Sequence, residues 1–348
     1  MPKPLMVRSQ SLGSGKITKN KTVKYVPSPA NRKRLVSQSS STFSGESTDS
    51  EFPSPSHSIT KIAELLSNAT DDDLLGHEPL LLNREAEIDG VQEIIRSLTE
   101  REKSQLPDIN MPIRHLRAEK GNVQKAIQKC KAALKWREEF GVGQITTCMQ
   151  TGGELEKIIK FEGETGKIYV RGYDKDGRAV VYMDNSRANS DNVIDNMRHL
   201  VWNLEKAFAC TARKSIEKGA TRPLEKYCLA INFIGFQLSA APSLSVSKFT
   251  LEILQTHYPE RMHRAYVLNP PLSFRVFWNL VKPFIDPVTK SKIVFCSPGS
   301  EGMKQFHREM GPENLDKLEP FAGGTKKVKD YDAQEYFGLP MDVTFAED

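Results

Sequence analysis

The residues whose types could perform chemistry match no catalytic motif. The pairs Gly15-Lys16 and Gly166-Lys167 resemble the end of a phosphate-binding P-loop, but Ile follows each lysine and no glycine lies five residues before either pair. No G-x-G-x-x-G follows an expected strand, and the sequence contains neither H-E-x-x-H nor G-x-S-x-G. We therefore expect a protein that is not an enzyme and that needs no cofactor.

The cysteines and histidines show no spacing typical of metal ligands. The chain has five cysteines without any C-x-x-C pair, namely Cys130, Cys148, Cys210, Cys228 and Cys296. This spacing argues against a zinc ribbon, a redox pair and a disulfide framework. We expect buried, reduced thiols and no metal site.

Composition and charge indicate one globular domain with additional segments. The chain has 348 residues, of which 38% are apolar and 27% are charged. Its net charge of +5 is too balanced to indicate a nucleic-acid-binding protein. The sequence has no run of 18 apolar residues and no apolar segment of the secretory type near its start, so we expect a soluble, cytoplasmic protein.

Residues 1–57 form a basic, Ser-rich tail that we expect to be disordered. Residues 1–50 hold nine Lys and Arg, 11 Ser and only two acids, which gives them a charge of +7 and leaves −2 for the rest. Few large apolar side chains are present to offset the entropy of ordering this segment. Besides a plain tail, two interpretations stay open: an organelle-targeting peptide and an electrostatic tether that holds the protein at the periphery of an anionic membrane.

The elements that must position any site change character along the chain. Residues 58–145 show helical patterns: Glu85–Lys103 is typical of a polar helix, and apolar residues recur at steps of three and four between Gly121 and Gly141. From residue 150 to residue 325 strands alternate with helices, which predicts βαβ crossovers and a mainly parallel sheet. Residues 326–348 follow as a C-terminal extension.

The α/β region begins with a hairpin whose turn contains Gly177, where a positive φ is needed. The elements expected are the strands Lys167–Tyr173 and Ala179–Met183, a helix from Asp191 to about Gly219, the strand Tyr227–Phe233, the helix Val246–His257, the strand Ala265–Leu268, the helix Leu272–Val281 and the strand Ile293–Phe295.

The expected helix 272–281 is apolar in almost every direction. Eight of the 13 residues from 272 to 284 are large and apolar, and the polar side chains form one narrow stripe of Arg275, Asn279 and Lys282. Such a helix is either buried between the sheet and its neighbours, or a movable lid that contacts a hydrophobic ligand on one side and a bilayer on the other. Prolines at both ends would confine bending to the hinges of a lid.

Three motifs follow one another in this part of the chain: Tyr258-Pro259-Glu260-Arg261, Asn269-Pro270-Pro271, and Pro283-Phe284-Ile285-Asp286-Pro287 with its continuation to Ile293. They resemble the CRAL-TRIO lipid-transfer family, in particular the branch that exchanges phosphatidylinositol and phosphatidylcholine. Pro112–Lys120, Trp136-Arg137 and Leu318–Gly324 are similar to further parts of that branch. The resemblance implies an N-terminal helical region followed by an α/β domain, whose mainly parallel sheet forms the floor of a hydrophobic pocket closed by a gate helix.

The resemblance also implies which residues bind a lipid headgroup: Lys120, Glu260, Thr289 and Lys292. The two ammonium groups can face phosphate, the Thr289 hydroxyl can donate to it, and the Glu260 carboxylate can accept from inositol hydroxyls. The implied gate helix carries Leu272, Phe274, Phe277, Trp278 and Val281. Without the resemblance, Lys120 and Lys292 are better explained as surface charges, and Glu260 as a partner of Arg261 or Arg264.

Two departures concern the ligands. Glu119 stands where the branch commonly has a basic residue, which places a negative charge near the implied phosphate. Gln237 and Ser239 stand where the branch tends to have small hydroxyl residues that hold phosphocholine, so another lipid or a sterol could replace phosphatidylcholine.

The main hypothesis is a protein that encloses phosphatidylinositol and a second hydrophobic ligand in turn, and exchanges them during transient membrane contact. It implies no nucleic-acid partner and a lipid kinase as the candidate protein partner. Two alternatives stay open: a carrier of a sterol, tocopherol or retinoid, and a signalling scaffold in which the pocket is vestigial.

Overall fold

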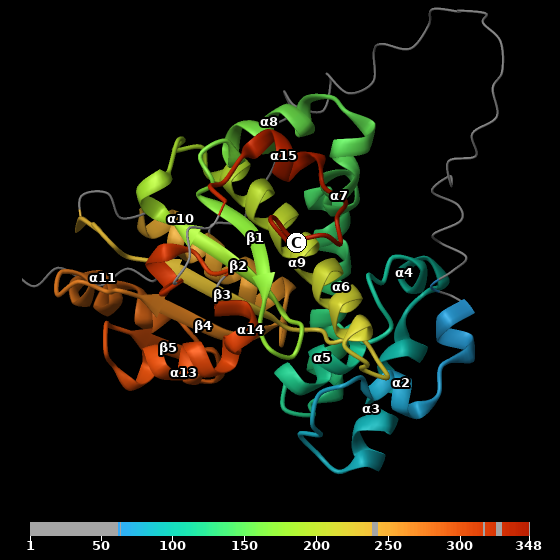
Figure 1. Ribbon diagram of the computed structural model, residues 1–348. Helices are drawn as coiled ribbons and strands as arrows, with labels where there is room; N and C mark the ends of the chain where they lie inside the picture. Colours follow the sequence, from blue (N-terminus) through green and yellow to red (C-terminus); the bar gives the residue numbers. More distant parts are fainter. Residues whose placement is uncertain (1–61, 63, 239–242, 316, 325–328, 348) are drawn as a thin grey trace, which may run out of the picture. The chain divides into compact units, whose positions relative to one another are not determined.

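The computed structural model describes residues 62, 64–238, 243–315, 317–324 and 329–347 (Figure 1). The tail expected at residues 1–57 lies outside the described residues, as do Ser239 and the first residues of the C-terminal extension. The expected domain bounds at residues 58–145 and 150–325 stay predictions.

The first part of the described chain is helical and has an apolar core of its own. The buried side chains of this core include Ile94, Ile113, Leu116 and Leu134. The helices are α2 (Asp71–Leu75), α3 (Arg84–Ser97), α4 (Glu100–Ser104), α5 (Met111–Ala118), α6 (Val123–Phe140), α7 (Val142–Thr151) and α8 (Glu154–Gly163).

The prediction of one helix over Glu85–Lys103 was wrong, because α3 ends at Ser97 and α4 begins at Glu100. Thr99 and Glu102 form a capping box between them: the Thr99 hydroxyl accepts from the Glu102 N–H at 3.2 Å, and the Glu102 carboxylate accepts from the Thr99 N–H at 2.8 Å. This pair satisfies backbone N–H groups at the start of α4. A new helix therefore begins at Glu100, although the polar helical pattern suggested one continuous helix. Helix α6 ends at Gly141 as expected, and Gly141 itself adopts a left-handed conformation with φ 76°.

The second part contains a five-stranded sheet in the order β1-β2-β3-β4-β5, which Figure 1 shows side by side. β1 pairs antiparallel with β2, and β2 to β5 are parallel. The strands are β1 (Ile168–Tyr173), β2 (Ala179–Asp184), β3 (Tyr227–Asn232), β4 (Met262–Leu268) and β5 (Ile293–Cys296). The predicted α/β fold with a mainly parallel sheet is thus confirmed, and β4 begins three residues earlier than the apolar pattern indicated.

The crossovers place their helices on one face of this sheet. Parallel strands that follow one another in spatial order, with crossovers of one hand, put every crossover on the same side. The connecting helices are α9 (Val193–Glu217), α10 (Leu244–Glu252) with the π-helical turn η4 (Ile253–His257), α11 (Phe274–Val281) and α12 (Pro287–Ser291), with short turns η2 (Asn185–Arg187) and η5 (Lys282–Phe284). The expected helices at 191–219, 246–257 and 272–281 are confirmed with small shifts of their ends.

The sheet also packs against elements from the C-terminal part. α13 packs against β5, and its Phe306 ring lies 4.7 Å from the ring of Tyr266 on β4. These elements are α13 (Glu301–Met310), α14 (Pro312–Leu315), η6 (Pro320–Ala322) and α15 (Ala333–Gly338). All five cysteines are buried and free, as expected from their spacing.

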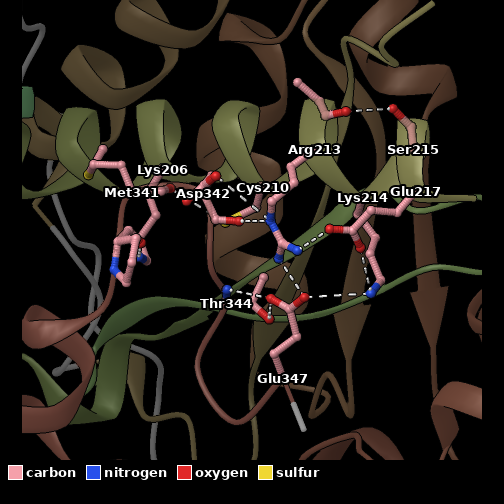
Figure 2. A network of polar contacts seen from close by, with 12 residues as sticks. Lys206, Cys210, Arg213, Lys214, Ser215, Glu217, Met341, Asp342, Thr344 and Glu347 are labelled. Carbon is pink, nitrogen blue, oxygen red and sulfur yellow. Dashed lines mark hydrogen bonds and ion pairs between the residues drawn. The ribbon is translucent and has the colours of Figure 1, made fainter.

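The last described residues run along β1 and α9 as a C-terminal strap, which we define as residues 331–347. The Phe345 N–H donates to the Val170 carbonyl at 2.9 Å, next to a parallel bridge between Arg171 and Phe345. Figure 2 shows the side chains of α9 that hold the strap: Lys206 donates to the Pro340 carbonyl at 2.6 Å, and Arg213 donates to the Asp342 carbonyl at 2.7 Å and pairs with Glu347. The strap therefore covers the edge strand β1, whose unpaired backbone groups would otherwise be exposed.

Candidate functional site

A cavity of about 490 Å³ lies between the sheet and the crossover helices. Its volume falls within the range of about 300–1,000 Å³ that is usual for small-molecule sites. Strands β2 to β5 contribute its floor, and α9, α10 and α11 contribute its walls. Most of the lining is apolar and includes Met183, Leu200, Leu229, Ile231, Leu254 and Val267.

Helix α11 separates this cavity from the solvent. Four of the five predicted gate residues line the cavity: Phe274, Phe277, Trp278 and Val281. Leu272 does not line it, because α11 begins only at Phe274 and the Leu272 side chain is 80% exposed. The aromatic rings pack on one another and on the end of β3, with Phe274 only 4.3 Å from Phe233.

The opposite side of α11 is apolar and exposed. Val276 and Leu280 are 51% and 55% exposed, and they lie four residues apart on a side of α11 that faces away from Phe274 and Val281, which line the cavity. The alternative of a helix buried between the sheet and its neighbours is therefore wrong. Two apolar sides, one toward the cavity and one toward solvent, fit the alternative of a lid.

The C-terminal end of α11 is tied to the turn η4. The Gln255 side chain donates to the Phe284 carbonyl at 3.0 Å and accepts from the Asp286 N–H at 2.8 Å. Gln255 lies in the π-helical turn that follows α10, and such turns are frequent at functional sites. The Gln255 side chain thus connects the segment after α11 to the turn that follows α10.

Three of the four predicted headgroup residues gather near the amino-terminal ends of β4 and β5. The Lys292 ammonium lies 3.1 Å from the Glu260 carboxylate, and the Lys292 N–H donates to the Thr289 carbonyl at 3.1 Å. Thr289 lines the cavity, and within the described part of the chain its hydroxyl makes no hydrogen bond. The site therefore carries one positive and one negative side chain, Lys292 and Glu260, and both are mostly buried.

Two further charged residues near Glu260 were missed by sequence reasoning. The Lys226 ammonium lies 3.8 Å from Glu260 and 2.8 Å from Glu78. Burial by itself would raise the pKa of Glu78, but the ammonium of Lys226 outweighs it and holds that pKa below its ordinary value. Lys226 directly precedes β3, so a lysine at the start of an apolar parallel strand was the available signal.

The fourth predicted residue, Lys120, stands apart in the turn between α5 and α6. It is exposed, and its ammonium forms no ion pair with the residues that the structure describes. Lys120 and Glu260 nevertheless share a feature: both have a positive φ, 54° and 57°. For residues other than glycine this conformation costs about 1–3 kcal/mol and clusters at ligand-binding sites.

The alternative pairing of Glu260 with Arg261 or Arg264 does not occur. Arg261 pairs with Asp108, and Arg264 pairs with Glu309 at 3.2 Å. Arg261 therefore binds the helical region to the start of β4, while Glu260 is left to face Lys226 and Lys292.

The opposite end of the cavity holds polar residues that the sequence did not reveal as a site. Lys167, Asn185, Ser190 and Asn196 line it near the start of β1 and the carboxyl end of β2. Lys167 is buried and pairs with the buried Glu162. The pair Gly166-Lys167 stood out only as a failed phosphate loop, and nothing in the sequence placed Glu162 or Asn196 beside it.

Comparisons with known proteins agree with this fold and show the family of the chain. Residues 163–324 match the model of the CRAL/TRIO domain. The chain is 30% identical over 260 residues to the SEC14 cytosolic factor of Kluyveromyces lactis, which covers 73% of this chain and 82% of that protein. The chain belongs to the CRAL-TRIO family.

Two other relatives narrow the placement. The phosphatidylinositol transfer protein PDR17 of Saccharomyces cerevisiae is 30% identical over 217 residues, or 59% of this chain and 55% of that protein. The CRAL-TRIO domain-containing protein C23B6.04c of Schizosaccharomyces pombe is 37% identical over 186 residues, or 53% of this chain but only 17% of that protein. Within the family, the chain lies in the branch of the SEC14 and PDR17 proteins, although it spans only part of two of these relatives.

Two further findings bear on membranes and metals. None of the helices in the described ranges is long and apolar enough to span a membrane. The same residues contain no group of His, Cys, Asp and Glu side chains that could hold a metal ion.

Proposed function

We propose that this protein binds a phospholipid, with phosphatidylinositol as the main ligand, and exchanges it at membrane surfaces through movement of α11. The observation that carries the proposal is the large, mostly apolar cavity, one wall of which is a helix with apolar residues on two sides. The name of PDR17 as a phosphatidylinositol transfer protein supports the same ligand class.

The cavity supplies what an acyl chain needs. Each CH₂ group exposed to water costs about 0.8 kcal/mol, so a carrier must keep most of the chain enclosed while it moves through water. The aromatic side chains of α11 form part of the cavity wall. Opening α11 against a bilayer would let the acyl chains pass without exposure to water, and its exposed residues Val276 and Leu280 would contact the bilayer at that moment.

The charged residues near the amino-terminal ends of β4 and β5 suit a phosphorylated headgroup with several hydroxyls. Lys292 can turn from Glu260 toward a phosphate, with Thr289 as a second donor, and Glu260 would then accept from an inositol hydroxyl. Lys226 keeps a positive charge beside Glu260 in both arrangements. Lys120 is proposed as the residue that completes the site from the helical region.

The test combines native mass spectrometry with a vesicle transfer assay. The purified full-length chain is incubated with vesicles that contain labelled phosphatidylinositol, and bound and transferred lipid are measured. Lys292→Ala should lower phosphatidylinositol binding by about tenfold or more, because one charge-assisted hydrogen bond contributes about 1.5–3 kcal/mol. The matched control is Lys290→Ala, since Lys290 is exposed on the same short helix.

Two results would contradict the proposal at different levels. Failure of the wild-type protein to take up any phosphatidylinositol would reject the ligand. Normal uptake by Lys292→Ala would reject only the assignment of the headgroup residues.

A further inference from the structure

Four charged side chains of alternating sign meet near the amino-terminal ends of β3, β4 and β5. The Lys226 ammonium lies 2.8 Å from the carboxylate of Glu78 and 3.8 Å from that of Glu260. The Lys292 ammonium lies 3.1 Å from Glu260. All four side chains are mostly buried, and their two positive and two negative charges balance. Lys226 and Glu78 are not among the headgroup residues that the resemblance implies.

Both ammonium groups approach the same oxygen of Glu260. Lys226 and Lys292 face its Oε2, whereas its Oε1 makes no hydrogen bond with the residues that the structure describes. Glu260 also has a φ of 57°, a conformation that residues other than glycine keep only where their surroundings enforce it. One oxygen of Glu260 is thus compensated by cations, and the other is available to accept from a ligand hydroxyl.

Lys226 is held in its turn by the helical region. Its partner Glu78 lies in the segment between α2 and α3, which is fixed at both ends. The Gly76 N–H caps the end of α2, and the Leu82 N–H donates to the buried Glu87 carboxylate at 3.2 Å. Glu78 is therefore a fixed partner that restrains the movement of Lys226.

The proposed headgroup contact separates Lys292 from Glu260. If Lys292 turns toward a phosphate, Glu260 loses the nearer of its two cations, and a mostly buried carboxylate without a counter-charge is costly. Because Glu78 restrains Lys226, Lys226 is the cation that remains beside Glu260 when a lipid is bound.

We propose that Lys226 is a positioning residue of the headgroup site, which acts on the lipid only through Glu260. It compensates Oε2 and holds the carboxylate in place, so that Oε1 accepts from an inositol hydroxyl while Lys292 binds the phosphate. The inference rests on the proposed function, because it assumes that Glu260 contacts the headgroup, and it adds a residue that lies outside the three motifs.

The experiment compares two phospholipids of the same charge that differ in their hydroxyl groups. Vesicles carry phosphatidylinositol or phosphatidylethanol, a phosphodiester whose headgroup has no hydroxyl, and the lipid bound by the full-length protein is measured by native mass spectrometry. Lys226→Gln should lower phosphatidylinositol binding about tenfold, the value of one charge-assisted hydrogen bond, and change phosphatidylethanol binding less than about threefold. Lys226→Arg keeps the positive charge and should restore phosphatidylinositol binding.

A double-mutant cycle separates positioning from a purely structural role. Lys226→Gln should weaken phosphatidylinositol binding far less in the Glu260→Gln background than in the wild-type background, because no carboxylate is left there to be positioned. A structural effect of losing the pair with Glu78 would be the same in both backgrounds. Lys226→Met repeats the cycle with an apolar side chain, so that the test does not depend on the folding of one variant. The matched control is Lys175→Met, which removes one positive charge from an exposed turn and should bind both lipids as the wild type does.

The outcomes separate this inference from the proposed function. Equal losses of the two lipids, or equal effects of Lys226→Gln in the two backgrounds, would overturn the positioning role even if the wild-type protein binds phosphatidylinositol. Absence of phosphatidylinositol from the wild-type protein would instead overturn the proposed function. A loss confined to phosphatidylinositol, which Lys226→Arg restores and the Glu260→Gln background removes, would support the positioning role.

Discussion

At the scale of single residues, buried ion pairs connect the helical region to the sheet. Arg114 pairs with Asp108 at 2.8 Å and with Glu225, and Arg261 pairs with the same Asp108. Burial by itself would raise the pKa of Asp108, but the two guanidinium groups hold it far below its ordinary value. Asp108 therefore pairs with two arginines from different parts of the chain, and Glu225 is a second partner of Arg114.

We expect Asp108→Asn to lower the free energy of unfolding by about 3 kcal/mol at pH 7, because it leaves buried guanidinium groups with less compensation. A carboxylate with a depressed pKa stabilises the fold above its unfolded pKa of about 4, and this stabilisation is lost as the pH falls further. The difference between wild type and variant in urea unfolding should thus shrink below about pH 4. The control is Asp89→Asn on the exposed side of α3; a variant that matches wild type at pH 7 would contradict this account.

At the scale of elements, α11 is the helix whose two sides differ in what they contact. Its inner side packs on Phe233 and lines the cavity, whereas its outer side presents Val276 and Leu280 to solvent. Exposed apolar side chains do not stabilise the isolated protein, and together on one side of a helix they indicate a contact with another apolar surface. Contact with a bilayer during exchange is the one that the proposed function supplies.

We expect Val276→Asp to lower the rate of lipid transfer between vesicles at least tenfold, because a carboxylate on the outer side of α11 opposes insertion into the bilayer surface. Stability and the amount of lipid already bound should stay within a factor of about two, since Val276 is exposed in the closed state. Asn279→Asp adds the same charge to the polar stripe of the same helix and should transfer lipid almost normally. Equal effects of the two substitutions would show that charge alone, and not the apolar side of α11, is responsible.

At the scale of the whole described part of the chain, the C-terminal strap completes the edge of the sheet. Phe345 is fully buried, with its ring near those of Tyr169, Tyr331 and Tyr336. Tyr336 in turn accepts from the Val170 N–H at 2.9 Å and donates to Asn203 on α9 at 2.7 Å. Burial lowers the pKa of Lys206, which contacts the same strap, to about 8. The strap, which follows Gly323 and Gly324 in the sequence, is therefore part of the fold.

We expect Phe345→Ala to lower the free energy of unfolding by about 3–5 kcal/mol, the usual cost of removing a buried aromatic side chain. Val343→Ala, two residues earlier in the strap and only partly buried, should cost about 1 kcal/mol or less. Urea unfolding followed by tryptophan fluorescence measures both. A Phe345→Ala variant as stable as Val343→Ala would mean that the strap is not needed to cover β1.

Much of the fold could be predicted from local patterns. The turn at Gly177, the end of α6 at Gly141 and the alternation of strands and helices all follow from a few neighbouring residues, and the structure confirms them. The break between α3 and α4 was missed because polar residues that favour a helix, Glu100 to Lys103, follow Thr99. A capping box is also local, so this break was readable from the Thr99 and Glu102 pair and was overlooked.

The candidate site was predictable only in part. Glu260 lies in the first of the three motifs and Thr289 and Lys292 lie in the third, and the structure brings them together near the amino-terminal ends of β4 and β5, where Thr289 lines the cavity. Their role in headgroup binding stays a prediction. Lys226 and Glu78 were missed because Lys226 reaches Glu260, and Glu78 reaches Lys226, from segments that are far apart in sequence.

The sequence by itself determined the order of the elements, the parallel sheet and the apolar character of α11, because each depends on periodicity or turn chemistry within a short stretch. Only the tertiary structure decided that α11 has one exposed side and that the C-terminal strap covers β1. It also decided that Lys167 meets Glu162 at the polar end of the cavity opposite Thr289. These features depend on which segments pack together in space, and side-chain burial and charge balance are set by that packing and not by neighbours along the chain.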